Sequence, residues 1–239
     1  MLENSEVKLT ELFRPSDYSA ALVKCLLDEE TGVSGARVLD VGCGSGVLLA
    51  AAGVAGAAHL TGVDIEANAV AVTSALLNEE VNEVPRDIHQ GELFAPLGDQ
   101  QFDLVLANLP HFPTDQTCNA PTTVDGRLAS WSAGGADGRR LLDQFLAGLP
   151  PYLAPNGRAL IMHNAFIGLD QTREKAAALG LSFYIVDSFL VPLTQTKVSL
   201  MTPDILARES GKSVFLFGDY AFGAVSLVSL AWSDVKGAS

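Results

Sequence analysis

The sequence predicts an α/β fold in which helices cover both faces of a mostly parallel β-sheet. Strand-like apolar runs alternate with helical patterns from residue 36 to residue 191, and such alternation is typical of parallel sheets. Glycines and acids stand where several of these strands end, and such sheets bind ligands beyond their carboxyl ends. With 239 residues and 48% hydrophobic content, the chain is long enough for a three-layer core in a single domain.

The expected elements follow from the spacing of apolar residues. A helix with one apolar face is expected at 16–30, and residues 31–35 turn into the first strand. Further helices are expected at 45–53, 67–78, 138–149 and 170–179, and strands at 36–41, 59–64, 86–90, 102–107, 157–163 and 182–191.

The tail departs from this alternation. A short helix is expected at 203–210, and β-rich runs follow at 214–218 and 224–232. These two runs predict either a hairpin or one antiparallel insertion with an edge strand.

A glycine-rich turn follows the first strand. Residues 38–46 read Val-Leu-Asp-Val-Gly-Cys-Gly-Ser-Gly, so an apolar strand ends in Asp40 and turns through Gly42, Gly44 and Gly46. A dinucleotide fingerprint spaces its glycines G-x-G-x-x-G, whereas here the third glycine comes one residue early. The D-x-G-x-G-x-G pattern resembles the first motif of class I S-adenosylmethionine (SAM)-dependent methyltransferases. This resemblance implies SAM as the cofactor and a Rossmann-like fold, with a seven-stranded sheet and an antiparallel strand near its C-terminal edge.

Acids after the next two strands continue this resemblance. Asp64 ends the second strand, where a carboxylate can accept from two ribose hydroxyls, and Glu92 follows the third strand. In the family an acid at the latter position accepts from the adenine amino group, and we assign the neighbouring Ile65 and Leu93 to the same cofactor site. The alternative is that the acids are only solvated strand ends.

The fourth strand is followed by Asn108-Leu109-Pro110-His111, which resembles the N-P-P-Y/F motif of methyltransferases acting on amide or exocyclic nitrogen. In that family, the Asn side chain and the next backbone carbonyl accept the amide hydrogens, and the aromatic ring packs over the planar group. These catalytic roles fall on Asn108, the main chain of Leu109 and His111. His111 could instead hydrogen-bond the substrate or accept a proton, Phe112 could supply the platform, or the loop could simply turn away from the sheet.

Two further segments narrow the resemblance to the protein-glutamine N-methyltransferases that modify release factors. Residues 12–17, with Pro15, resemble the segment that covers the cofactor in that family, and residues 134–139 resemble its G-G-x-D/N-G-R/L segment. The similarity runs from about residue 12 to residue 165. It implies a helical cofactor-covering segment at 1–35 and a methyltransferase domain at 36–239, without the separate N-terminal substrate domain of bacterial members.

Composition limits the partners. The net charge of −13 repels nucleic-acid phosphates, so no nucleic-acid partner is expected. Arg127, Arg139 and Arg140 are interpreted as solvated surface rather than a basic patch. The N-terminal residues lack the features of a signal peptide, and no apolar stretch has the length of a membrane span, so a cytoplasmic protein is expected.

The cysteines and histidines lack the spacing of metal ligands, and neither a disulfide nor a metal is expected. The long loop at 113–133, with Trp131, is assigned to substrate recognition. Trp131 is equally explained as a core anchor.

The sequence therefore predicts a SAM-dependent N-methyltransferase whose acceptor is most simply a protein glutamine. The alternatives are a small-molecule biosynthetic methyltransferase and a SAM-binding partner without catalysis. A partner subunit or a homo-oligomer is compatible with each of these functions. The acceptor and the oligomeric state are left open by the sequence.

Overall fold

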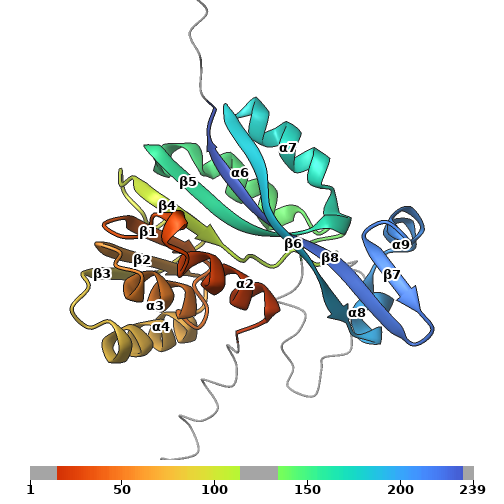
Figure 1. Ribbon diagram of the computed structural model, residues 1–239, viewed down its shortest axis with the longest axis horizontal. Coiled ribbons are helices and arrows are strands. Elements are labelled where there is room, and N and C mark those ends of the chain that lie inside the picture. Colours follow the sequence, from red (N-terminus) through yellow and green to blue (C-terminus); the bar gives the residue numbers. More distant parts are fainter. Residues whose placement is uncertain (1–14, 114–133, 234–239) are drawn as a thin grey trace, which may run out of the picture. The chain divides into compact units, whose positions relative to one another are not determined.

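The computed structural model describes residues 15–113 and 134–233 (Figure 1). The chain divides into two compact units. The first consists of Met1–Asn108 with Gly148–Ile161, and the second of Leu109–Ala147 with Met162–Ser239. Strand β5 (Leu153–Asn164) begins in the first unit and ends in the second.

The strands follow one path, in the order β3-β2-β1-β4-β5-β8-β6, and β7 pairs with β8 beside this path. Neighbouring strands among β1 to β5 are parallel, while β8 is antiparallel to both β6 and β7. The predicted α/β fold is thereby confirmed, including the antiparallel strand next to the C-terminal edge. The described residues form eight strands instead of the seven expected, because β7 is added beside the path. The remaining strands are β1 (Arg37–Val41), β2 (His59–Asp64), β3 (Arg86–Gln90), β4 (Phe102–Ala107), β6 (Leu181–Leu193), β7 (Val214–Phe217) and β8 (Tyr220–Trp232).

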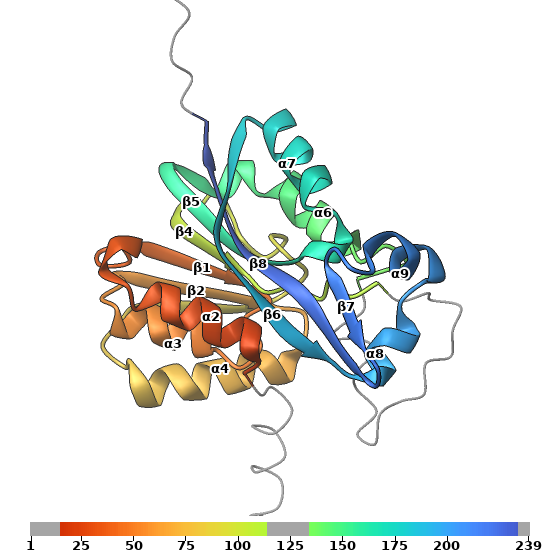
Figure 2. The ribbon, with the colours of Figure 1, turned by 45° about the vertical axis from the view of Figure 1, so that its right-hand side comes forward.

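In the first unit, three α-helices lie together beside β1 and β2, as Figures 1 and 2 both show. Helix α3 packs against α2 and α4, and it contacts both β1 and β2. The elements are α2 (Asp17–Leu26), α3 (Val47–Val54), α4 (Ala67–Glu80) and the 3-10 helices η1 (Glu29–Thr31) and η2 (Pro150–Tyr152).

The register of the first unit brings its strand ends to one edge. In the parallel pairing, Asp40 lies opposite Gly62 on one side and Leu106 on the other. Asp64 lies opposite Gln90. Because the strands are parallel, the turns after β1, β2, β3 and β4 all leave the sheet at its carboxyl edge.

In the second unit, β6 and β8 form a long antiparallel pair, with β7 beside one end of β8 (Figure 2). The helical elements of this unit are α6 (Arg140–Gly148), η3 (Ala165–Ile167), α7 (Leu169–Ala178), α8 (Gln195–Leu200) and α9 (Pro203–Glu209). The expected short helix near 203–210 is α9, and the two β-rich runs of the tail are β7 and β8.

None of the described helices is long and apolar enough to cross a membrane.

Candidate active site

Strand β1 carries a buried carboxyl group one residue before its carboxyl end. Asp40 is fully buried, and neither of its carboxylate oxygens has a hydrogen-bond partner among the described residues. Burial, and secondarily the nearby charge of Asp64, raises the pKa of Asp40 to about 8. Burial also raises the pKa of the neighbouring Cys43 thiol above its ordinary range, so this thiol is not a nucleophile at neutral pH.

Asp64 fixes the glycine loop from the end of β2. Its Oδ2 accepts a hydrogen bond from the Gly44 N–H at 2.9 Å, and its Oδ1 accepts from the Glu66 N–H at 2.9 Å. The Gly42 N–H also donates to the carbonyl of Val63 at 2.7 Å. An ionised carboxylate has about four acceptor positions, so roughly two stay available after these bonds.

Helix α4 contacts the glycine loop through Thr73, a residue that the sequence analysis does not identify. The hydroxyl of this buried threonine donates to the carbonyl of Gly44 at 3.2 Å. Gly46, the N-cap of α3, has φ of 79°, and a Cβ there would lie 2.9 Å from the Thr73 Cα. The close approach of α4 therefore requires glycine at this position. One threonine in an alanine-rich helix gives no sequence signal for such a contact.

The turn after β3 lies alongside the end of β2. The Gly91 N–H donates to the Asp64 carbonyl at 2.9 Å. Glu92 is exposed, and Leu93 has a φ of 49°, in the left-handed region that non-glycine residues rarely adopt. Strain of this kind is often found at ligand-binding turns. Ile65 is 63% exposed, which leaves a large apolar side chain at the surface beside Asp64.

This edge of the first unit has the groups that SAM requires. The free acceptor positions of Asp64 suit two ribose hydroxyls, and the exposed side chain of Ile65 suits a planar apolar base. Gly42 is exposed and Gly44 is half-buried, and neither has a side chain, so the backbone at these two positions is open to a ligand. The residues present therefore fit SAM.

The candidate catalytic turn follows β4. Ala107 pairs with Val41, so Asn108 leaves the sheet level with the start of the glycine turn. Asn108 is half-buried, whereas Leu109 and His111 are buried. The structure thus brings Asn108 to the same carboxyl edge as Asp40 and Asp64 within the first unit.

His111 is turned inward. Its Nδ1 lies 2.5 Å from the carbonyl oxygen of Leu109, and its ring also hydrogen-bonds the side chain of Asn164. Burial, as the largest cause, lowers the pKa of His111 to about 4. Phe112 is buried as well, and its ring meets that of Phe166 edge to face at 5.7 Å.

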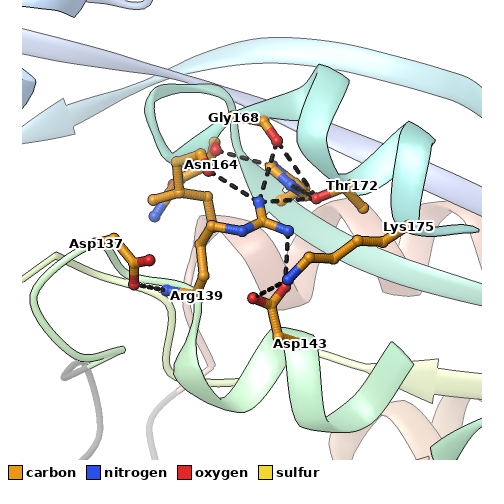
Figure 3. Close-up of polar contacts among 9 residues, drawn as sticks. Asp137, Arg139, Asp143, Asn164, Gly168, Thr172 and Lys175 are labelled. Atoms are coloured by element: carbon orange, nitrogen blue, oxygen red, sulfur yellow. Dashed lines mark hydrogen bonds and ion pairs between the residues drawn. The ribbon is translucent and has the colours of Figure 1, made fainter. Parts of the chain in front are cut away.

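Arg139 is the clearest disagreement with the sequence analysis. It was interpreted as solvated surface, but its side chain is only 2% exposed. Its guanidinium donates to the carbonyl of Ile167 at 2.9 Å. It also donates to the Gly168 carbonyl at 3.1 Å and to the Thr172 hydroxyl at 3.0 Å (Figure 3). It also pairs with Asp143 at 2.8 Å. Arg139 therefore connects residues 167 and 168 with Thr172 and Asp143 through hydrogen bonds. Arg140 is exposed, as expected.

Other predicted positions are only partly described. Pro15 is exposed just before α2, while residues 12–14 and the expected recognition loop from residue 114 to residue 133, including Arg127 and Trp131, lie outside the described residues. Cys25 and Cys43 are free thiols. Within residues 15–113 and 134–233, no three His, Cys, Asp or Glu side chains are grouped as metal ligands would be.

Several solved methyltransferase structures share this fold. The chain aligns over 92% of its length with Mtq2 in the Encephalitozoon cuniculi Mtq2–Trm112 complex, which methylates the termination factor eRF1, with a TM-score of 0.58, 14% identity and 98% of that chain covered. It also aligns with the Thermus thermophilus 16S rRNA methyltransferase RsmC in complex with AdoMet and guanosine, with a TM-score of 0.54 and 16% identity, over 92% of this chain and 44% of that one. At these identities the likeness establishes the fold.

Sequence relatives identify the class and the family. A family model for ribosomal protein L11 methyltransferase (PrmA) matches residues 23–111, which hold the glycine turn, the ordered acids and Asn108. Fold and site thus define a class I SAM-dependent methyltransferase. A Methanocaldococcus jannaschii protein is 32% identical over 198 residues, or 82% of this chain and 95% of the relative. That relative is named as a protein N5-glutamine methyltransferase, although its name marks the activity as unproven. The chain belongs to this family.

Two longer bacterial relatives match part of the chain. The Bradyrhizobium diazoefficiens ribosomal protein uL3 glutamine methyltransferase is 33% identical over 55% of this chain. The Geobacter sulfurreducens release factor glutamine methyltransferase is 34% identical over 53% of it. The matched regions are 41% and 44% of those proteins, so the chain spans less than half of their length.

Proposed function

We propose that this methyltransferase binds SAM at the carboxyl edge of the first unit and methylates the side-chain amide nitrogen of a glutamine in a protein. The observation that carries the proposal is Asn108, which leaves β4 level with the start of the glycine turn after β1. The family membership supports the same reaction.

Residues of the strand ends, the glycine loop and the segment before α2 would hold SAM in this proposal. The carboxylate of Asp64 would accept from the ribose, and Glu92 would accept from the adenine amino group. Ile65 and Leu93 would pack on the base. The glycine loop admits the amino-acid end close to the backbone, and Pro15 precedes the helix expected to cover the site.

The difficulty of the reaction is the weak nucleophile. An amide lone pair is delocalised over the carbonyl group, and it must point at an electrophilic carbon to react. SAM supplies that carbon as a sulfonium methyl group. The Asn108 side-chain oxygen and the Leu109 carbonyl oxygen accept the two amide hydrogens, which orients the nitrogen. Holding two reactants in such geometry can lower a barrier by roughly 7–11 kcal/mol.

The proton lost by the amide needs no strong base. A methylated amide nitrogen that still carries both hydrogens is acidic, so water or a weak acceptor suffices after transfer. His111 is an unsuitable acceptor near neutral pH, because burial lowers its pKa to about 4 and Leu109 already engages its ring. Asn108 and Leu109 therefore carry the catalytic role by orientation.

The acceptor is proposed to be a glutamine in a protein because the relatives that modify uL3 and release factors act on glutamine. A small-molecule acceptor is the second candidate. It is favoured by a Ubiquinone biosynthesis O-methyltransferase from Aromatoleum aromaticum that is 35% identical over 44% of this chain. A partner subunit is also proposed, because Mtq2 was solved with Trm112.

The test is a methyl-transfer assay with SAM labelled in its methyl group. Two peptides differing only by Gln or Glu at one position would be compared, together with a set of small amines and phenols. We expect label in the Gln peptide, at a mass of one methyl group on the amide, and none in the Glu peptide.

The variant Asn108→Ala should reduce this transfer by about 100-fold or more, since it removes one of the two orienting acceptors. Asn82→Ala, at an exposed and distant position before β3, is the matched control. Equal transfer by Asn108→Ala and wild type would overturn the proposed site. Transfer to small molecules alone would overturn the protein acceptor.

A further inference from the structure

We propose that His111 is a positioning residue, whose ring fixes the Leu109 carbonyl as an acceptor for the substrate amide, and that a buried chain from Arg139 holds this ring in place. The inference rests on the amide-methylating function proposed above. It gives a role to the buried network of the second unit, which the site for SAM does not use.

The hydrogen bond between His111 and Leu109 has a defined direction. A carbonyl oxygen can only accept, so the Nδ1 atom that lies 2.5 Å from it must carry the hydrogen. The bond is buried at both ends. A carbonyl oxygen has two lone pairs, so one is still available for an amide hydrogen of the substrate.

This bond compensates for a change in the turn itself. In the N-P-P-Y motif that the turn resembles, the second residue is a proline, whose ring restricts the backbone. Leu109 stands there in this chain, and its peptide group is freer to rotate. His111 stands where the motif has its aromatic residue, and its ring restrains the Leu109 carbonyl. The two differences from the motif therefore act together: Leu109 replaces the restrictive proline, and the ring of His111 restrains the carbonyl of Leu109.

The ring of His111 is itself held by a buried chain of hydrogen bonds. The side chain of Asn164 hydrogen-bonds the His111 ring. The backbone carbonyl of Asn164 accepts from Nδ1 of His163 at 2.8 Å. The Thr172 hydroxyl lies 2.7 Å from Nε2 of His163. Arg139 donates to the same hydroxyl at 3.0 Å, as Figure 3 shows.

The donor and acceptor roles along this chain of hydrogen bonds follow from its fixed groups. The Asn164 carbonyl fixes the hydrogen of neutral His163 on Nδ1, so its Nε2 must accept. The Thr172 hydroxyl donates to Nε2, and its oxygen accepts from Arg139. Burial lowers the pKa of His163 to about 3, which keeps this ring neutral. The Thr172 hydroxyl has a second, longer contact with the Gly168 carbonyl at 3.4 Å, so its 2.7 Å contact with His163 is the shorter of the two.

The first test needs no activity. Nitrogen NMR of histidine-labelled protein at neutral pH should show His111 as the neutral Nδ1–H tautomer, assigned by the loss of its signals in His111→Asn. The Nε2–H tautomer, or a ring that titrates near its ordinary pKa, would overturn the proposal whatever the protein catalyses.

The second test separates the hydrogen bond from packing. His111→Asn places an amide N–H near the position of Nδ1, while His111→Leu fills the space without a donor. We expect His111→Leu to lower kcat for the Gln peptide by about 10- to 100-fold with little change in the Kd for SAM. His111→Asn should stay within about 3-fold of wild type. Equal losses in both variants, or no loss in His111→Leu, would overturn the proposal.

The third test concerns the supporting chain. Thr172→Val removes the hydroxyl that links Arg139 to His163 at almost unchanged volume, and it should lower kcat in the same direction as His111→Leu. Thr61→Val is the control, because Thr61 is also buried and its hydroxyl also faces a histidine, His59, at 3.5 Å. Equal kcat values for Thr172→Val and wild type would remove Arg139 and Thr172 from the proposal.

Different results would overturn the proposed function and the positioning role of His111. Wild-type protein that methylates no amide peptide overturns the proposed function, and with it the catalytic use of His111, even where NMR shows the Nδ1–H tautomer. Methylation that is unaffected by His111→Leu overturns only the positioning role.

Discussion

At the level of single residues, the buried carboxyl group of Asp40 makes stability depend on pH. Its pKa is 3.8 when unperturbed and about 8 in the folded protein, so between these values the folded state binds more protons. The contribution of Asp40 to the free energy of unfolding therefore falls as the pH rises through this range. Asp40→Asn removes this contribution and leaves those of the other titrating groups in place.

Urea unfolding of both proteins between about pH 5 and pH 8 measures this difference. We expect the variant to gain stability relative to wild type as the pH rises. Parallel profiles would show that Asp40 is ionised in the folded protein.

Gly46 gives a second prediction for a single residue. Gly46→Ala combines a positive φ with a Cβ 2.9 Å from the Thr73 backbone. Gly35→Ala is the matched control, since Gly35 has φ of 76° and nothing within 4 Å of the added Cβ. Gly35→Ala should lower the free energy of unfolding by about 1 kcal/mol. Gly46→Ala should lower it by about 1–3 kcal/mol more, because α4 must move. Similar losses in both would refute the close packing.

Several site residues were predictable because their signal is local. Asp40 and Asp64 stand in the last two residues of apolar strands and Asn108 directly after one, and parallel pairing places such residues at one edge. Arg139 was not predictable in this way. Its acceptors are the carbonyls of residues 167 and 168 and the hydroxyl of Thr172, and a contact across about 30 positions leaves no periodic mark in the sequence.

At the level of elements, strands with clear ends were predicted with their observed bounds, as for β2, β3 and β4. β5 begins at Leu153 instead of residue 157, because Leu153 pairs with Phe102 before the register shifts to Leu104 and Arg158. The intervening Pro155 and Gly157 have the composition of a turn. Helix α8 was missed because Thr, Val and Ser are weak helix formers, and its Thr194 cap was the only local signal.

Helix α2 depends on its cap. The Ser16 side chain accepts from the Ser19 N–H, and the Ser19 side chain accepts from the Ser16 N–H, so a capping box starts the helix. Ser16→Ala should lower the free energy of unfolding by about 1 kcal/mol, measured by urea denaturation, while Ser16→Asn should retain most of it. Because α2 packs on α3, whose N-cap is Gly46, we expect loss of the cap also to loosen the support of the glycine loop. An equal loss with Asn would mean that capping is not the cause.

At the level of the whole molecule, the negative net charge disfavours an RNA substrate. RsmC shares the fold, but the net charge of −13 disfavours contact with a phosphate backbone. Fluorescence anisotropy with a labelled RNA hairpin should therefore show no binding at protein concentrations up to about 50 µM at physiological salt. Salt-sensitive binding in the micromolar range would reveal a basic surface and reopen an RNA substrate.

The central claim is that the carboxyl edge of the first unit holds SAM through Asp64. Calorimetric titration with SAM tests it most directly, with wild type, Asp64→Ala and the control Asp87→Ala, whose side chain is exposed and pairs with His59 at 3.3 Å. We predict binding at roughly 1–100 µM for wild type and the control, and at least about 10-fold weaker binding for Asp64→Ala. No binding by wild type, or equal binding by Asp64→Ala, would contradict this assignment of the cofactor site.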